Sequence, residues 1–194
     1  MPELNDYSGE FKPDFQFSDL SKETLVKLIE SYQRIFQGLC VAGLQVLQER
    51  QGKDVGQEQF NEIYRRTMQR FAIPLIRKTL NIRDDDVISM FKYFQVAPDG
   101  CRGGGMYDFN FNIKNKNDVS YTGKFCQNAA FYEKHGDTDG LNRLCASGPG
   151  SLEHEAYEVI SKAFNPKMKM AWPLLPPRAS GDAPFCQWRF WIEG

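Results

Sequence analysis

The sequence predicts an α+β fold, in which an N-terminal helical region precedes a four-stranded antiparallel sheet with helices on one face. Three observations predict it. Apolar residues recur at helical spacing through the first half, the period changes to two after the glycine-rich segment "CRGGG", and the second half follows the order β-β-α-α-β-β. We expect an N-terminal arm (1–17), a helical region (18–97) and an α+β region (98–194), packed as one compact unit.

The first half of the chain has the apolar spacing of amphipathic helices. Ser21 can cap a long helix that carries Glu23 in its first turn, and the segment "RQGKD" ends this helix. A second helical pattern (60–71) meets Pro74, which we expect to kink the helix or to start a new segment. A third helix follows the acidic cap "DDD". The stripe of the first helix consists of Leu25, Leu28, Ile29, Tyr32, Phe36, Leu39, Gly43, Val46 and Leu47.

The second half begins with the period of a β-hairpin. In "MYDFNFNIK" apolar and polar residues alternate, and "NKND" makes a turn into "VSYTGKF". The remaining predicted elements are two helices, "CQNAAFYEKHG" and "SLEHEAYEVISKAF", and two strands, "KMKMAW" and "FCQWRFWIE".

Composition bounds the function classes. Lys and Arg total 24 against 25 for Asp and Glu, which argues against a nucleic-acid or membrane-surface partner. No apolar run approaches the roughly 20 residues of a membrane helix, and the polar start "MPELNDYSGEF" is unlike a secretion signal. Five cysteines without a CxxC pair fit a reduced compartment. We therefore expect a cytoplasmic protein with a small-molecule partner, and "GLCVAG" in the first helix is suited to close packing in a homodimer.

Three features favour structural roles. The segment "CRGGGMY" lacks the Lys-Ser/Thr of a phosphate loop and is typical of a flexible loop or a bulge. His135 precedes Gly136, where a histidine commonly caps the carbonyl end of a helix. His154 lies about 200° around the helix from Leu152, so we expect it to face solvent.

Cys126 is a candidate nucleophile because it falls where a strand passes into a helix. A thiol at a helix N-terminus has its thiolate stabilised by the unpaired amides and the dipole. Ala129, Ala130 and Glu133 follow on the same side of the helix and place a carboxylate in line with the thiol. The competing interpretation is that Cys126 and the alanines only let the helix pack closely on the sheet.

Two further candidates lie on the next helix and the last strand. Glu153 shares a side with Ala156, which favours an inward orientation, whereas first-turn acids mostly complement the dipole. Cys186 shares one face of its strand with Trp188 and Phe190. The opposite face is also largely apolar, which predicts a strand covered on both sides.

These segments together resemble a known family. The order "KFCQNAAFYEKHG", Cys145, "EHEAYEVISKAFNPKMKM" and "LLPPRASGDAPFCQWRFW" is similar to that of mostly uncharacterised cytosolic bacterial proteins related to L-2-amino-thiazoline-4-carboxylate hydrolase. The likeness spans roughly Phe17 to Ile192. The ending "GDAPFCQWRF" also resembles the end of the small-molecule-binding domains named after vinyl reductase. The first resemblance implies hydrolysis of a small ring, and the second implies a sensor or carrier.

The first functional hypothesis is a hydrolase-like enzyme that opens a C–N or C–S bond of a small cyclic substrate such as a thiazoline carboxylate. Such a reaction needs a nucleophile or activated water, an acid for the leaving nitrogen, and a cation for the substrate carboxylate. Cys126 is the candidate nucleophile, and Glu153 or Glu133 the acid/base. Arg178 or Arg189 is the candidate carboxylate anchor.

The second hypothesis is a binding module without turnover. Cys126, Cys145 and Cys186 would converge as ligands of a zinc ion or an iron-sulfur cluster, although their spacing lacks the short paired loops typical of such sites. A third interpretation is that the three cysteines are only packing residues. The pocket would then be defined by the aromatic side chains of Tyr107, Phe109, Trp172 and Trp188.

Overall fold

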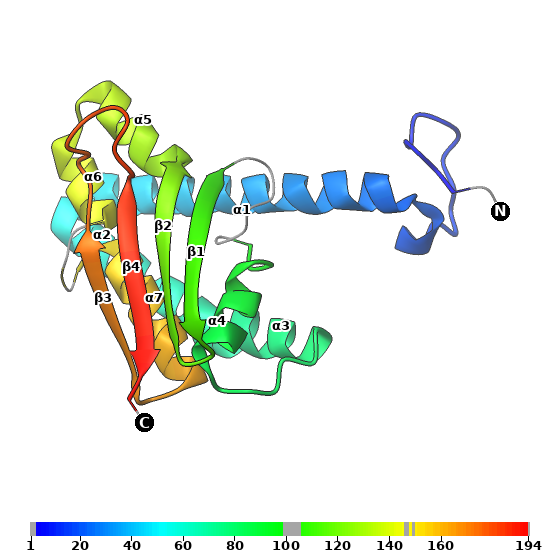
Figure 1. The fold of residues 1–194 in the computed structure, drawn as a ribbon. Coiled ribbons are helices and arrows are strands. Elements are labelled where there is room, and N and C mark those ends of the chain that lie inside the picture. The colour runs from blue at the N-terminus through cyan, green and yellow to red at the C-terminus, as the bar shows by residue number, and fades with distance from the viewer. Residues whose placement is uncertain (1–2, 99–105, 146–147, 149, 194) are drawn as a thin grey trace.

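An antiparallel sheet with helices packed against one of its faces forms the body of the molecule in this computed structural model, which confirms the α+β prediction (Figure 1). The structure describes residues 3–98, 106–145, 148 and 150–193. Cys101 and the glycines of the predicted loop lie outside the described residues. The strand order is β1-β2-β4-β3, with β1 at Tyr107–Asn115, β2 at Asp118–Cys126, β3 at Met168–Leu174 and β4 at Cys186–Ile192.

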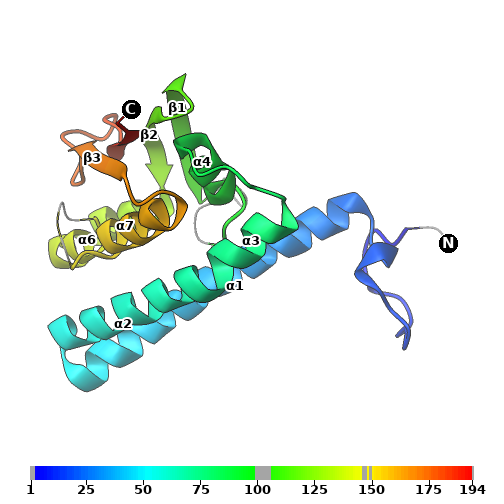
Figure 2. The ribbon, with the colours of Figure 1, turned by 90° about the horizontal axis from the view of Figure 1, so that it is seen from below.

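The helical half begins with a long helix, α1 (Lys22–Gln51). The hydroxyl of Ser21 accepts a hydrogen bond from the amide of Thr24 at 3.3 Å, so the predicted N-cap is confirmed. Gly52 ends α1 with φ 85°, a conformation that glycine adopts without strain. The N-terminal half of α1 projects beyond the body and carries the N-terminal arm at its end (Figures 1 and 2).

The second helix, α2 (Lys53–Thr67), turns back along the C-terminal half of α1. The two helices cross closely at Gly56, where an added Cβ would lie 2.5 Å from the backbone nitrogen of Gln48. A π-helical turn, η2 (Met68–Ala72), continues α2 into α3 (Ile73–Thr79). Pro74 lies in the first turn of α3, so it starts a new segment as predicted. The helix α4 (Val87–Phe94) is capped by Asp86.

Three helices lie between the hairpin and the last two strands. The predicted pair corresponds to α5 (Gln127–His135) and α7 (Leu152–Phe164). The third, α6 (Thr138–Cys145), was not predicted, because it is short and lies where the sequence shows no extended apolar stripe. Cys145 therefore ends a helix and is buried.

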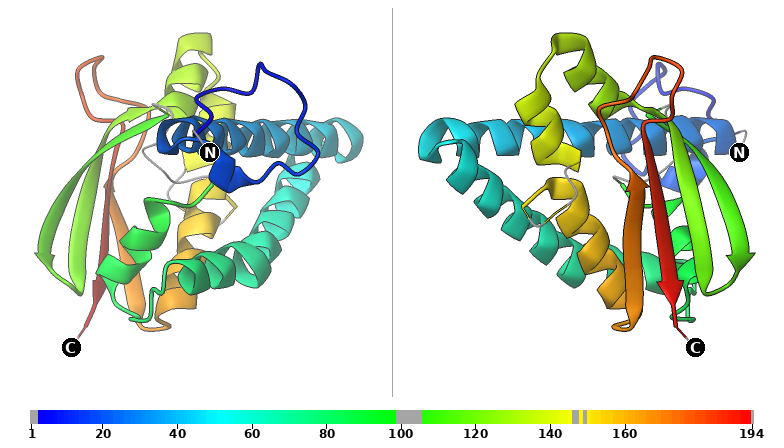
Figure 3. Two further views of the ribbon diagram at one scale, coloured as in Figure 1. Left: turned by 90° about the vertical axis from the view of Figure 1, so that its right-hand side faces the viewer. Right: turned by 60° about the vertical axis from the view of Figure 1, so that its left-hand side comes forward.

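The predicted solvent exposure of His154 is wrong. Its side chain is buried and lies edge-on to the ring of Trp172, with ring centroids 4.8 Å apart. The reason is the position of α7, which contacts β3 as well as α2, α4 and α6 and is therefore covered on most sides. Figure 1 shows α7 behind the sheet, and the right-hand view of Figure 3 shows it beside β3. The predicted cap is confirmed: the Nδ1 of His135 lies 2.7 Å from the carbonyl oxygen of Phe131.

The outer face of the sheet is not covered by any described element, so the prediction of a strand covered on both sides is wrong. Arg189 is exposed on this face, bonds the carboxylate of Asp118 at 2.8 and 2.9 Å, and lies over the ring of Trp191. This polar pairing makes the outer face compatible with water. Within the described part of the chain, no helix combines the length and the apolar character needed to cross a bilayer.

Both edge strands are irregular. The β1–β2 pairing shifts register between Asp108 and Phe109 and again near Ile113. The β3–β4 pairing shifts between Ala171 and Leu174, in the segment that contains Pro173. The pairing of the two central strands, β2 and β4, is regular. On the inner face of the sheet, Val119 and Tyr121 of β2 lie beside Phe190 and Trp188 of β4, and all four side chains are buried.

Candidate functional site

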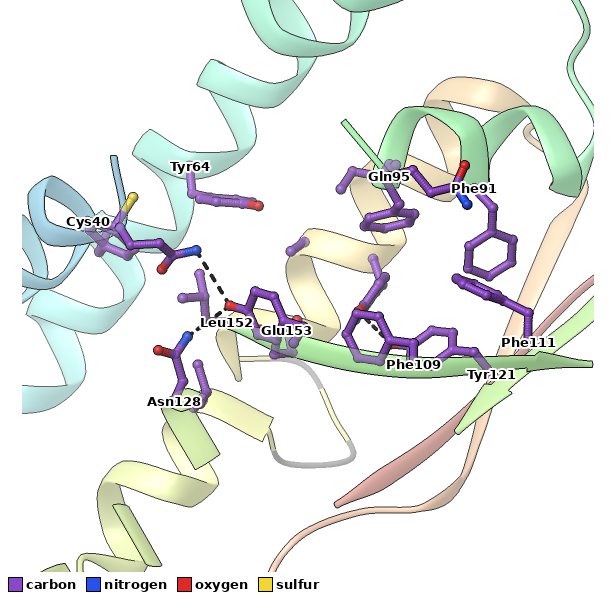
Figure 4. Close-up of a pocket in the computed structure, with 18 residues that line it drawn as sticks. Cys40, Tyr64, Phe91, Gln95, Phe109, Phe111, Tyr121, Asn128, Leu152 and Glu153 are labelled. Carbon is purple, nitrogen blue, oxygen red and sulfur yellow. Dashed lines mark hydrogen bonds between the residues drawn. The ribbon is translucent and has the colours of Figure 1, made fainter. Parts of the chain in front are cut away.

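Two adjoining cavities lie between the inner face of the sheet and the helices. The larger has a volume of about 80 Å³ and the smaller about 30 Å³. The larger is lined mainly by aromatic side chains from α2, α4, β1, β2 and α7 (Figure 4). Five residues line both cavities: Tyr107, Phe109, Tyr121, Glu153 and Tyr157.

Glu153 supplies the carboxylate of the site. It lies in the first turn of α7, and it is the only acidic residue among the described residues that line either cavity. Its charge contributes to raised pKa values at Cys126, Cys145 and Cys186, where burial is the larger cause. The inward orientation expected from its place on the helix is therefore confirmed.

A polar edge closes the larger cavity on the side of α1 and α5. The hydroxyl oxygen of Tyr107 accepts hydrogen bonds from the side-chain amides of Asn128 at 3.1 Å and Gln37 at 3.5 Å. These three residues come from β1, α5 and α1, and the dashed line from Asn128 in Figure 4 marks one of the two hydrogen bonds. They provide neutral donors and acceptors at a wall that is otherwise apolar.

A pair of buried tyrosines forms the floor. The hydroxyl of Tyr121 donates a hydrogen bond to the hydroxyl of Tyr157. Burial raises the pKa of both hydroxyls well above the usual value, and the charge of Glu153 raises both further. Both tyrosines therefore stay protonated at neutral pH and can act only as hydrogen-bonding groups.

Cys126 lies at the helix N-terminus, as predicted, but its thiol is not activated. Its sulfur accepts a hydrogen bond from the amide of Ala129 at 3.4 Å, which favours the thiolate. Burial has the larger opposite effect and raises the pKa of Cys126 to about 12. The predicted stabilisation of the thiolate by the helix amides is present, but burial outweighs it, because the side chain is desolvated between α5 and the sheet.

Cys186 and Cys145 line the smaller cavity together with Cys126. Burial raises the pKa of Cys186 to about 12 and that of Cys145 well above its usual range. The sulfur of Cys186 lies over Gly123, where an added Cβ would approach it to 2.8 Å. Within residues 3–98, 106–145, 148 and 150–193, no three His, Cys, Asp or Glu side chains are arranged to hold a metal ion. The convergence of the three thiols as a metal site is thus not found, although they share one cavity.

Glu133, Arg178 and Arg189 do not line either cavity. Arg178 bonds Glu133 at 2.7 and 2.9 Å and stacks on the ring of Phe185, so these two predicted functional residues form a structural ion pair. Arg189 lies on the outer face of the sheet with Asp118. The predicted acid/base role of Glu133 and both predicted carboxylate anchors are therefore not supported by position.

Three of the four aromatic candidates are well placed. Tyr107 and Phe109 line both cavities, and Trp188 lines the smaller one. Trp172 lines neither cavity and packs against His154 instead. Sequence reasoning did not assign Tyr121 or Tyr157 to the site. The alternation of "VSYTGKF" does place Tyr121 on the inner face, whereas Tyr157 follows Glu153 by four residues and so lies on the same side of α7.

Comparisons of this chain with protein-family models, with curated proteins and with solved structures found no match. A single carboxylate, protonated hydroxyls and thiols, and an aromatic wall can bind a small molecule and transfer a proton to or from it.

Proposed function

We propose that the protein binds a small cyclic molecule in the two adjoining cavities and hydrolyses one of its C–N bonds, with Glu153 as the group that moves the proton. The observation that carries the proposal is that Glu153 lines both cavities, so that any molecule occupying them meets its carboxylate. A carboxylate in an apolar site is suited to acid–base work. The resemblance to proteins related to a thiazoline hydrolase supports the same class of reaction.

The cavity size limits the substrate. The larger space is about half the volume of the 150 Å³ cavity that accepts benzene, so it suits a ring of about five atoms. The aromatic wall favours a flat ring, and the amides of Gln37 and Asn128 can bind a polar substituent at the edge. A cyclic amidine such as a thiazoline or an imidazoline has this size and shape.

The raised thiol pKa values favour water over Cys126 as the attacking group. The carboxylate of Glu153 takes a proton from water as the water oxygen bonds to the amidine carbon, the C=N electron pair moves to nitrogen, and Glu153 passes the proton to that nitrogen. The hydroxyl of the tetrahedral intermediate then gives its proton to Glu153 as the C=O bond forms and the ring C–N bond breaks. The electrons of the broken bond stay on nitrogen, and Glu153 passes this second proton to it. The net change is the addition of one water molecule.

The test is hydrolysis of a panel of thiazolines and imidazolines, with and without a carboxylate substituent, followed by chromatography. We expect Glu153→Gln to lower turnover about 100-fold or more while binding changes only slightly. Glu158→Gln is the matched control, because Glu158 lies on the same helix and is exposed. Equal turnover in the two variants would remove Glu153 from the reaction.

A binding module without turnover is the second candidate. It is favoured by the protonated state of all three thiols and both tyrosines, which leaves no activated nucleophile among the described side chains of the site. Saturable binding of a panel compound, measured by calorimetry, with no product after long incubation would support this candidate. It would overturn the hydrolase proposal for that compound class.

A further inference from the structure

The long helix α1 carries an apolar stripe that the described part of its own chain leaves largely exposed. The stripe follows a heptad repeat, with steps of three and four residues, which is the spacing of a coiled-coil seam. Four of its members are strongly exposed: Tyr32 at 52%, Ile35 at 65%, Leu39 at 69% and Val46 at 45%. We call this set the α1 seam; it consists of Leu25, Leu28, Tyr32, Ile35, Leu39, Ala42 and Val46.

The α1 seam is distinct from the face by which α1 packs on its own body. That inner face contains Phe36, Cys40 and Leu44, which pack against the core. By the 100° rotation per residue of an α-helix, Leu39 lies roughly 100° around the axis from Cys40. The two faces therefore look in different directions, and only the inner one has a partner within the described chain.

The N-terminal arm adds a second exposed apolar group at the projecting end of α1. The rings of Tyr7 and Phe15 stack with centroids 4.9 Å apart, and Phe17 packs edge-on to Phe15. Phe11 is 81% exposed and Phe17 is 60% exposed. Figures 1 and 2 show the arm far from the sheet and from the other helices, so the body of its own chain does not cover these rings.

We propose that two copies of this chain dimerise by pairing their α1 seams antiparallel about a two-fold axis between Gln33 and Arg34. This register is self-complementary, as a two-fold interface requires. Leu28 of one copy then faces Leu39 of its partner, and Tyr32 faces Ile35. The third pair matches a large side chain, Leu25, with a small one, Ala42, and Val46 lies beyond these three pairs. A parallel pair would instead place Ala42 against Ala42 and leave a gap.

The area available fits a second copy. Five seam side chains are exposed and two, Leu25 and Leu28, are partly exposed, so that the seam presents roughly 500 Å² per copy, or about 1,000 Å² in the pair, which reaches the size expected of a biological interface. The antiparallel pairing also carries each arm toward the C-terminal end of the partner's α1, where the arm's rings gain a surface to pack on. Each copy thus covers the seam and the arm that its own body leaves exposed.

The first test is sedimentation equilibrium of the full chain at micromolar concentration. We expect a dimer, and we expect Leu39→Glu and Ile35→Glu each to raise the dissociation constant about 100-fold, because each places two charges in the apolar interface. Leu75→Glu is the matched control: Leu75 is 60% exposed but lies on α3, outside the seam. Circular dichroism checks that each variant is folded. A monomeric wild-type chain, or a dimer unaffected by both seam variants, would overturn the proposal.

The second test fixes the register by disulfide formation. Leu28→Cys combined with Leu39→Cys should link the two copies under mild oxidation, beyond the background of the wild-type cysteines. Leu28→Cys alone should not link the two copies, because the substituted positions of the two chains lie eleven residues apart in this register, about 17 Å along the helix axis. Efficient linking by Leu39→Cys alone would indicate a parallel pair and overturn the antiparallel arrangement.

Discussion

Replacing Gly123 by alanine tests whether the sulfur of Cys186 sets the shape of the smaller cavity. An added Cβ at Gly123 would lie 2.8 Å from the Sγ of Cys186 and 3.6 Å from the ring of Phe109. A carbon–sulfur contact is comfortable near 3.7 Å, so the methyl group intrudes by about 1 Å on the sulfur and by almost nothing on the ring. The clash is therefore specific to one neighbour.

The change in the free energy of unfolding caused by Gly123→Ala is the sum of two opposing effects. Overpacking of a core position costs about 1–3 kcal/mol, whereas replacing glycine in a strand recovers about 0.5–1 kcal/mol of backbone entropy. We expect Gly123→Ala to lower the free energy of unfolding by about 1–2 kcal/mol and the melting temperature by about 2–8 °C. Urea denaturation followed by fluorescence measures the change directly.

The second variant and the control make this prediction specific. Cys186→Ala removes the sulfur, so Gly123→Ala should be nearly neutral in that background, with a coupling energy of at least 1 kcal/mol. Gly43→Ala is the control, because its added Cβ would make an ordinary 3.7 Å contact with Phe60 and improve a helix. Equal losses from Gly123→Ala with and without Cys186 would refute the reasoning.

Three other predictions concern the thiols and the partly buried ion pair of Glu133 with Arg178. Burial raises the pKa of Cys126 and Cys186 to about 12. A thiol reagent at pH 8 should therefore react with these two thiols roughly a thousandfold more slowly in the folded protein than in urea. Equal reaction rates in the folded and unfolded protein would contradict this prediction. The same shift stabilises the fold below about pH 8.5, and this stability should be lost as pH rises from about 8.5 to 12, as measured by thermal melts across that range. Glu133→Gln leaves the partly buried Arg178 without its carboxylate and should lower the free energy of unfolding in urea by about 1–2 kcal/mol. The control, Glu62→Gln, removes one partner of an exposed ion pair and should lower it by less than about 1 kcal/mol. Similar losses in the two variants would show that burial of the pair is unimportant.

Local patterns were sufficient to predict most of the elements. The cap at Ser21 depends on residues that are neighbours in the sequence, and the alternation of "MYDFNFNIK" fixes which side chains enter the core. The burial of His154 could not be predicted this way. Its angle from Leu152 alone does not show whether it is buried, because α7 is covered by other elements on most sides.

The candidate site was predicted in part. The inward orientation of Glu153 and the positions of Tyr107 and Phe109 follow from the period of their own helix and strand. The ion pair of Glu133 with Arg178 joins residues 45 positions apart, and no local pattern reports such a contact. The helix start at Cys126 was visible in the sequence, but the desolvation that outweighs it depends on how closely α5 packs on the sheet.

The irregular edges of the sheet bear on how the protein behaves at high concentration. A regular edge strand offers unpaired amides and carbonyls to another strand and can seed fibrous aggregates. Here the register shifts in β1 interrupt one edge, and Pro173, which has no amide hydrogen to donate, interrupts the other. The sheet therefore resists extension by strand addition, which protects its long run of aromatic residues from amyloid-like association.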